Sequence, residues 1–244
     1  MNPFEFFIPQ NITVGAGTLA KLPECAKKLG GSHAMLISGP TLRKMGVVDK
    51  AADYLKDAGM AVDIFTDVEA NPSVTTVEKA TEAYKDSGAD FIVALGGGSP
   101  MDVAKAVGVT AKYGGSITEY EGAHKVPGKI VPLIAIPTTA GTSSEITNVT
   151  ALTDTVAVCK YVVIDNKLVP SHVIADPEFT RTMPKSVTAA TGMDAITHAV
   201  ESYISNMATP LTEYNSIKGL QIFRENLPKA VADGNDMEAR ENMM

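Results

Sequence analysis

The chain has 244 residues, of which 45% are hydrophobic and 20% charged, a composition typical of a globular protein with a sizeable core. Its net charge of −7 argues against nucleic acid or an anionic membrane as a partner, because both need a basic patch. The first ten residues lack the basic start and apolar stretch of a signal peptide, and no apolar run is long enough to span a bilayer. The two cysteines are too few for a disulfide framework, as is typical of proteins in a reducing compartment. We therefore expect a cytoplasmic protein.

Short apolar segments alternate with amphipathic, helix-length segments between residues 32 and 137. The pattern predicts strands at 34–37, 61–65, 91–95 and 131–136, and helices at 47–58, at 73–87 and from the end of a glycine loop to residue 113. Ser73 is expected to cap the second of these helices. Strands that alternate with helices predict an α/β fold, with a parallel sheet covered on both faces.

The pattern changes after residue 137. A loop of small residues leads into two segments at 148–153 and 156–164, which are expected to be extended segments or a hairpin, and into a last short strand at 173–175. Helices are predicted at 186–205, at 210–226 and after residue 236. We therefore expect an α/β domain over residues 1–180 and the first part of a helical domain over residues 181–244.

The segment Gly96-Gly97-Gly98-Ser99-Pro100-Met101-Asp102 directly follows a predicted buried strand and opens a helix. Glycines let a phosphate approach the backbone, and the free N–H groups at a helix start attract an anion. We expect Ser99 to cap this helix, with Pro100 at its first position, and the loop to bind a phosphate. A tight turn without a ligand stays an alternative, since the segment is neither G-x-G-x-x-G nor a P-loop.

A second polar loop, residues 137–145, also follows an apolar strand. Its hydroxyl side chains can hydrogen-bond a phosphate or a ribose, although an ordinary polar turn explains them equally well. If the two strands are neighbours in the sheet, the two loops share one crevice, which is the usual ligand position in open α/β sheets.

Asp194 and His198 stand four residues apart in the predicted helix at 186–205, so both side chains lie on one helix face. Their apolar neighbours predict a helix buried on more than one face, where an unpaired carboxylate is costly. A divalent cation is a suitable partner for a carboxylate and an imidazole. The alternative is a helix carboxylate beside a hydrogen-bonded core histidine. The remaining histidines are expected to be structural or solvent-exposed: His33, His124 and His172.

Together these segments resemble the iron-containing (group III) alcohol dehydrogenase family. The resemblance rests on the glycine loop, on Pro137-Thr138-Thr139-Ala140-Gly141-Thr142, and on Gly192-Met193-Asp194-Ala195-Ile196-Thr197-His198-Ala199-Val200-Glu201. It implies a parallel-sheet, dinucleotide-binding α/β domain, followed by the start of an all-helical domain, with the metal in the cleft between them. It also implies NAD or NADP as cofactor, Fe²⁺ or Zn²⁺ as metal, and a reaction between a small alcohol and its aldehyde or ketone.

The resemblance also assigns residues. It implies that Asp194 and His198 are two metal ligands and act in catalysis through the metal. NAD-preferring members carry an Asp where this chain has Gly39, so we expect dual use or a preference for NADP, unless Gly39 is only a turn residue. The expected cofactor-binding residues are Gly39, Gly97, Gly98, Ser99, Asp102, Thr138, Thr139, Thr142 and Lys160. For Lys160, a solvated lysine on a strand stays an alternative.

The family's other two metal ligands are histidines on later helices, and the sequence ends before residues of that kind. An Asp–His pair alone should hold a metal poorly, so a catalytically incomplete nucleotide-binding fragment stays an alternative. A related enzyme such as glycerol dehydrogenase or dehydroquinate synthase is another, although residues 192–201 fit the alcohol dehydrogenases better. We expect a homo-oligomer for the full-length form, and uncovered apolar helix faces in this chain.

Overall fold

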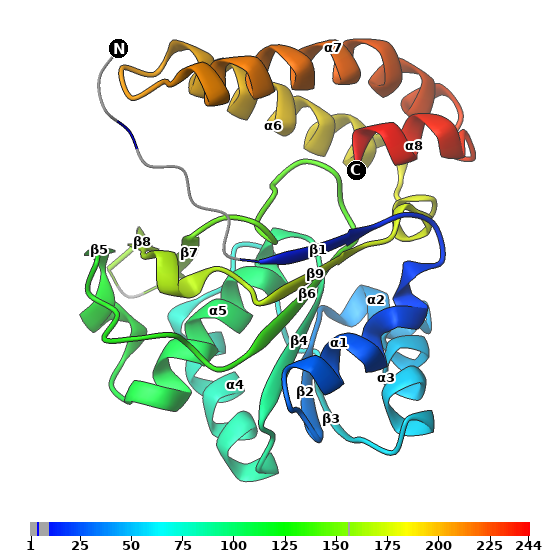
Figure 1. Cartoon of the computed structure of the whole chain (residues 1–244). Helices are drawn as coiled ribbons and strands as arrows, with labels where there is room; N and C mark the ends of the chain where they lie inside the picture. The colour runs from blue at the N-terminus through cyan, green and yellow to red at the C-terminus, as the bar shows by residue number, and fades with distance from the viewer. Residues whose placement is uncertain (1–3, 5–9, 156) are drawn as a thin grey trace.

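A computed structural model describes residue 4, residues 10–155 and residues 157–244. A parallel sheet carries helices on both faces, and the last three helices lie above the edge at which its central strands end (Figure 1). The predicted fold class is therefore confirmed. The prediction about a signal peptide concerns residues that lie almost wholly outside the described ones.

The central sheet has six strands in the order β1-β9-β6-β4-β2-β3, and every neighbouring pair is parallel. The strands are β1 Asn11–Val14, β2 His33–Ile37, β3 Ala61–Phe65, β4 Phe91–Gly96, β6 Leu133–Pro137 and β9 His172–Ala175. All six residues of β4 are buried, because a central parallel strand is covered on both faces. Sequence patterns missed β1, whose partner β9 lies far along the chain.

Two helical layers cover the sheet. One face carries α1 Leu22–Lys28 and α3 Val47–Asp57, and the other carries α4 Val74–Ser87 and α5 Gly98–Tyr113. Successive residues of β2 point to opposite faces, since Leu36 belongs to one hydrophobic core and Ile37 to the other. Ser73 caps α4 as predicted, because its hydroxyl accepts the N–H of Thr76 at 3.2 Å.

The remaining elements of the α/β part are short. A second sheet contains β5 Gly122–Ala123, β7 Val149–Asp154 and β8 Cys159–Ile164, and the antiparallel pairing of β7 with β8 confirms the predicted hairpin. Residue 156, inside the second predicted segment, lies outside the described residues. Short helices complete this part: α2 Pro40–Lys44 and the 3-10 turns Thr18–Lys21, Ile117–Tyr120, Asn166–Leu168 and Pro177–Thr180.

The C-terminal segment contains α6 Lys185–Ile204, α7 Pro210–Ala232 and α8 Met237–Met243. The first two pack closely at Gly192, where an added Cβ would lie 2.3 Å from Cδ1 of Leu227. α7 continues past Pro228, beyond the predicted end at residue 226. The domain boundary near residue 180 stays a prediction.

The prediction that α6 is buried on more than one face is wrong for this chain. Its only buried residues are Thr188 and Gly192, and Ile204 is 72% exposed. Large apolar side chains are exposed along α6, α7 and their connection: Val187, Met193, Val200, Tyr203, Ile204, Met207, Leu211, Tyr214 and Ile217. The expected uncovered apolar faces are therefore present. No helix in the described part of the chain has the length and apolar character needed to cross a membrane.

Candidate functional site

Three loops meet at the carboxyl edge of the sheet, where β2, β4 and β6 lie side by side. Gly96 pairs with Pro137 at the ends of β4 and β6, and the N–H of Thr138 donates to the carbonyl of Gly96 at 2.9 Å. The two polar loops therefore share one crevice. Because β3 lies beyond β2 while later strands add beyond β4, the topological switch point lies between β2 and β4, beside the glycine loop, and open α/β sheets bind ligands at such points.

The glycine loop begins its helix earlier than predicted. The cap of α5 is Gly97, so Ser99 and Pro100 are the second and third helical residues, and the prediction of Ser99 as cap is wrong. The physical reason is the backbone at Gly96. Its φ of 151° is a conformation that glycine adopts easily, and it turns the chain directly at the end of the strand. The first N–H groups of α5 have no partner within the helix and carry the positive end of its dipole.

The two glycine positions closest to the second loop leave little room for larger side chains. A Cβ on Gly97 would lie 3.2 Å from Oγ1 of Thr139, and one on Gly98 would lie 3.3 Å from Cγ2 of Thr142. Oγ1 of Thr139 is buried and has no hydrogen-bond partner among the described residues. A buried hydroxyl without a partner is costly, and a polar group of a bound nucleotide would supply one. The loop therefore fits a phosphate-bearing ligand.

A cavity of about 460 Å³ opens beside this loop, between α5, the β7–β8 hairpin and α6. Its lining includes several predicted site residues: Gly98, Ser99, Asp102, Thr142, Lys160 and His198. Other predicted site residues are not part of the lining, namely Gly39, Gly97, Thr138, Thr139 and Asp194. The cavity therefore joins the glycine loop to the helix that carries the candidate metal ligands.

Asp102 carries an unusual carboxyl group in this cavity. Its Oδ1 accepts a hydrogen bond from Oγ of Ser144 at 2.9 Å. Burial raises the pKa of Asp102 to about 6, although the nearby ammonium group of Lys105 and the bond from Ser144 act in the opposite direction. Protonation of this carboxyl group therefore falls close to neutral pH.

Sequence reasoning missed Lys105, which is 0% exposed. Burial lowers its pKa to about 8, against the attraction of Asp102 and Glu145. A charged residue inside the otherwise apolar run 103–109 was the signal that could have revealed it.

On the far side of the cavity, Nζ of Lys160 lies 3.4 Å from Oδ1 of Asn71, and both residues belong to the lining. Sequence reasoning missed Asn71 and Pro72, which follow β3. The Asn-Pro pair in the loop between β3 and α4, with Asn71 at a positive φ of 53°, marks a turn that could have been noticed. Gly39 caps α2 in an extended conformation, and an added Cβ would lie 3.4 Å from the carbonyl oxygen of Val68, so a side chain fits there.

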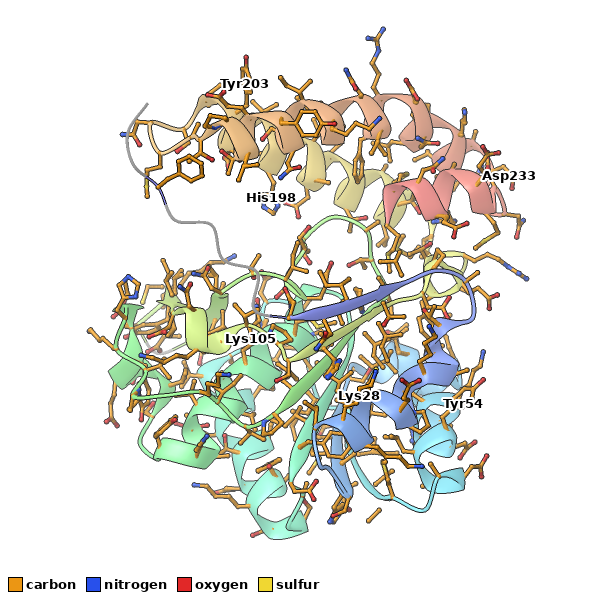
Figure 2. All side chains as sticks on the ribbon, viewed as in Figure 1. Lys28, Tyr54, Lys105, His198, Tyr203 and Asp233 are labelled. Atoms are coloured by element: carbon orange, nitrogen blue, oxygen red, sulfur yellow. The ribbon has the colours of Figure 1, made fainter. Side chains whose placement is uncertain are left out.

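Asp194 and His198 are brought together on α6, with 3.8 Å between Oδ1 and Nε2. Figure 2 shows the imidazole of His198 pointing from α6 toward the α/β part, and it lines the cavity. A carboxylate and an imidazole suit a divalent cation, but a catalytic site needs at least three protein ligands. The described residues contain no cluster of three His, Cys, Asp or Glu side chains able to hold a metal. Among the described residues, the pair therefore does not by itself make a complete catalytic metal site.

The helical segment is fixed over the cavity by a close contact with the second loop. A Cβ on Gly141 would lie 2.3 Å from the backbone oxygen of Thr191 on α6. Ala140 joins a small hydrophobic core with Leu227 of α7 and Met243 of α8. These contacts place His198 above the glycine loop.

Known proteins match nearly the whole chain. Residues 9–177 match the family described as iron-containing alcohol dehydrogenase, and residues 188–244 match the C-terminal part of the Fe-containing alcohol dehydrogenase family. An NAD-dependent methanol dehydrogenase from Bacillus methanolicus is 40% identical over 238 residues, and a 1,3-propanediol dehydrogenase from Citrobacter freundii is 40% identical over 242 residues. Each alignment covers 98% of this chain and 62% of the relative, so the chain spans less than two thirds of their length.

Solved structures agree with these matches. A crystal structure of 1,3-propanediol oxidoreductase superposes with a TM-score of 0.96 at 39% identity, covering 99% of this chain and 63% of that one. A sulfoacetaldehyde reductase from Bifidobacterium kashiwanohense in complex with NAD⁺ superposes with a TM-score of 0.94 at 33% identity, covering 100% of this chain and 64% of that one. The resemblance read from the motifs is confirmed, and the chain belongs to the iron-containing alcohol dehydrogenase family.

Proposed function

We propose that this chain is the nucleotide-binding part of a metal-dependent, NAD(P)-linked alcohol dehydrogenase that interconverts a small alcohol and its aldehyde or ketone. One observation carries the proposal: the glycine loop at the start of α5 and His198 of α6 line the same cavity. Hydride transfer requires the cofactor and the substrate to be held side by side, away from water.

Different residues of the chain bind different parts of the proposed dinucleotide cofactor. Gly97, Gly98 and Ser99 offer backbone N–H groups and the positive end of α5 to the pyrophosphate. Thr138, Thr139 and Thr142 border the crevice with hydroxyl groups, and the buried hydroxyl of Thr139, which has no partner among the described residues, supports a polar ligand there. Asp102 and Lys160 line the same cavity and complete the proposed cofactor-binding set.

We further propose Asp194 and His198 as ligands of a divalent cation, Fe²⁺ or Zn²⁺. Such a cation, when bound, supplies Lewis-acid polarisation of the substrate oxygen. The chain's part is to hold these two ligands on one face of α6, above the nucleotide loop.

Three further proposals concern the cofactor preference, the oligomeric state and the location of the protein, and each is supported by one feature of the chain. Gly39 stands where an acidic side chain would repel a 2′-phosphate, so we propose that NADP is accepted as well as NAD. The apolar faces of α6 and α7 support a homo-oligomer for the full-length form. The two cysteines, Cys25 and Cys159, are unpaired, which supports a cytoplasmic location.

The test compares this chain with a longer form that carries further C-terminal helices. Both are assayed for binding of NADH and NADPH, for metal content, and for reduction of short aldehydes. We expect both forms to bind nucleotide and only the longer form to show metal-dependent turnover. Absence of metal-dependent turnover in the longer form would contradict the dehydrogenase proposal.

A second candidate function is a nucleotide-binding fragment without turnover. The described residues offer two proposed metal ligands rather than three, which favours it for the 244-residue chain itself. Turnover by this chain without a partner would contradict it.

A further inference from the structure

A second large cavity lies at the amino edge of the central sheet, where the parallel strands begin. It has a volume of about 640 Å³, and its lining includes Asn11 and His172, the first residues of β1 and β9. The glycine loop lies at the opposite edge, where the strands end, and no described residue lines both cavities. In Figure 2, Lys28, which lines this second cavity from α1, lies far from His198. We call it the amino-edge cavity.

Positive charge gathers around the amino-edge cavity. Among its described lining residues none is acidic and four are lysines: Lys28, Lys112, Lys129 and Lys167. The chain as a whole has a net charge of −7, with 21 basic against 28 acidic side chains, so a general excess of lysine does not explain this cluster. Ammonium groups that surround one cavity raise its electrostatic potential and attract small anions.

Acidic side chains of the described part pair with only two of these lysines. Nζ of Lys28 lies 2.8 Å from Oε1 of Glu24, and Nζ of Lys167 lies 3.5 Å from Oδ2 of Asp165. The other two lysines of the lining form no ion pair with a described residue. An anion in the cavity would therefore meet positive charges that no carboxylate of the described part compensates.

The ends of the helices explain only part of the cluster. Lys28 and Lys112 lie in the last turns of α1 and α5, where the negative end of a helix dipole favours a cation. Lys129 lies in the loop before β6, and no α-helix ends there. This loop is fixed to α5, because Nζ of Lys112 and Oη of Tyr113 donate to the carbonyl oxygen of Lys129 at 2.7 and 2.8 Å. The fold therefore sets the backbone position of Lys129 beside the cavity.

The lining also contains a buried imidazole. His172 is 6% exposed, and its ring has no hydrogen-bond partner among the described residues. Burial and the nearby ammonium group of Lys28 lower the pKa of His172, so its ring is mainly neutral at about pH 7 and keeps one N–H donor. A buried polar group without a partner is costly. An anion in the cavity would accept this N–H.

We propose that the amino-edge cavity binds a small, multiply charged anion that carries phosphate or carboxylate groups. The lysine side chains supply the positive charge, and the N–H of His172 supplies a directed donor. The volume suits a small molecule, since ligand cavities commonly measure about 300–1,000 Å³. A polymer such as nucleic acid would meet the net negative charge of the chain outside the cavity. The site lies at the other edge of the sheet, so its ligand is independent of the nucleotide proposed for the glycine loop.

Titration calorimetry with inorganic pyrophosphate tests this site, in metal-free buffer of low ionic strength so that exposed charges are little screened. The titration is made with and without saturating NADH, because pyrophosphate could also enter the glycine loop. Lys28→Met/Lys129→Met removes two ammonium groups of the lining. Lys79→Met/Lys218→Met is the control, since it changes the net charge equally at exposed lysines of α4 and α7 outside the cavity.

We expect the dissociation constant of pyrophosphate to rise about tenfold in K28M/K129M and at most about twofold in K79M/K218M. A parallel titration with citrate distinguishes the two kinds of ligand. Tighter binding of pyrophosphate would indicate a ligand with phosphate groups, and tighter binding of citrate would indicate a polycarboxylate.

NMR spectra of the four histidines show where the anion binds. The ring signals of His172 should shift on addition of pyrophosphate, whereas those of His33 and His124 should not, because neither lines the cavity. His172→Phe keeps an aromatic ring and removes the N–H donor. We expect this change to weaken pyrophosphate binding about threefold.

The proposal would be overturned if neither anion binds at about 10 mM, if a folded K28M/K129M variant keeps parental affinity, or if the His172 signals do not shift. If the double variant does not fold, K129M alone decides, because the side chain of Lys129 forms no hydrogen bond or ion pair with a described residue. Its expected loss is about threefold, and parental affinity there would overturn the proposal. Failure of the chain to bind NADH would contradict only the function proposed above.

Discussion

Asp194 and His198 lie one turn apart on α6, with 3.8 Å between Oδ1 and Nε2. This separation is too long for a direct hydrogen bond, and the side chains are 42% and 51% exposed. His198 lines the cavity and Asp194 does not, and no hydrogen bond among the described residues holds either side chain. The chemistry of the pair suits a divalent cation, but two ligands leave most of the coordination sphere to other groups.

We therefore expect this chain to bind Zn²⁺ with a dissociation constant weaker than about 1 μM, because two ligands supply only half of a four-ligand site. His198→Ala should abolish this binding, measured by titration calorimetry. His33→Ala is the matched control, since His33 pairs with Asp63 at 2.7 Å outside the cavity. Sub-micromolar binding that survives H198A would contradict the assignment.

Gly97→Ala should weaken NADH binding on the order of tenfold, because the new methyl group would lie 3.2 Å from Thr139 and narrow the crevice. Gly219→Ala on α7 is the control, as nothing lies within 4 Å of its added Cβ. That change should instead raise the unfolding free energy by about 0.5–1 kcal/mol. Fluorescence titration and urea unfolding measure the two effects. Equal nucleotide affinity in both variants would argue against a role for Gly97.

Gly141→Ala should loosen the contact between the second loop and α6. The added Cβ would lie 2.3 Å from the backbone oxygen of Thr191, and a backbone atom cannot move aside as a side chain can. We expect a loss of about 1–3 kcal/mol, and faster hydrogen exchange in α6 to α8 than in β4. Parental exchange rates in α6 would show that this contact does not hold the helices in place.

Asp102→Asn should raise stability at neutral pH. The pKa of Asp102 is raised to about 6 in the folded chain and is about 3.9 when unfolded, so the folded state binds this proton more tightly. Its contribution to stability is therefore greatest below about pH 4 and is lost as the pH rises through about 6.

The neutral amide does not undergo this loss, and the predicted gain is on the order of 1 kcal/mol at pH 7.5, falling toward zero near pH 4. Urea unfolding of both proteins across this range measures it. A difference that does not change with pH would contradict a raised pKa at this site.

Gly39→Asp should reduce NADPH affinity on the order of tenfold while leaving NADH affinity within about twofold. The extended backbone at Gly39 accepts any side chain, so the variant should fold. Gly39→Asn is the control, because it has nearly the same shape without the charge. If G39D and G39N weaken NADPH equally, the charge is not the cause.

Local sequence patterns predicted much of this protein. Alternating apolar strands and amphipathic helices predict the parallel sheet, and the antiparallel hairpin follows from the same reasoning. The glycine loop and the four-residue spacing of Asp194 and His198 predict the two halves of the site, and the motifs identify the family. All of these features depend on residues close together in the chain.

What the sequence alone did not determine depends on contacts between distant segments. β1 becomes a strand only by pairing with β9, and α5 starts at Gly98 because Gly96 turns the chain where β4 ends. The exposed face of α6 likewise depends on which helices pack against it.

The cavity is the clearest case. Its lining residues come from separate segments, at 71–72, within 98–102, within 142–153, and at 160 and 198. The ammonium group of Lys105, which does not line the cavity, binds the carbonyl oxygen of Val149 in its wall. Sequence by itself determined which chemical groups are present. Only tertiary packing decided which of them share one cavity, because burial, hydrogen-bond partners and the pKa values that follow from them arise when distant segments exclude water together.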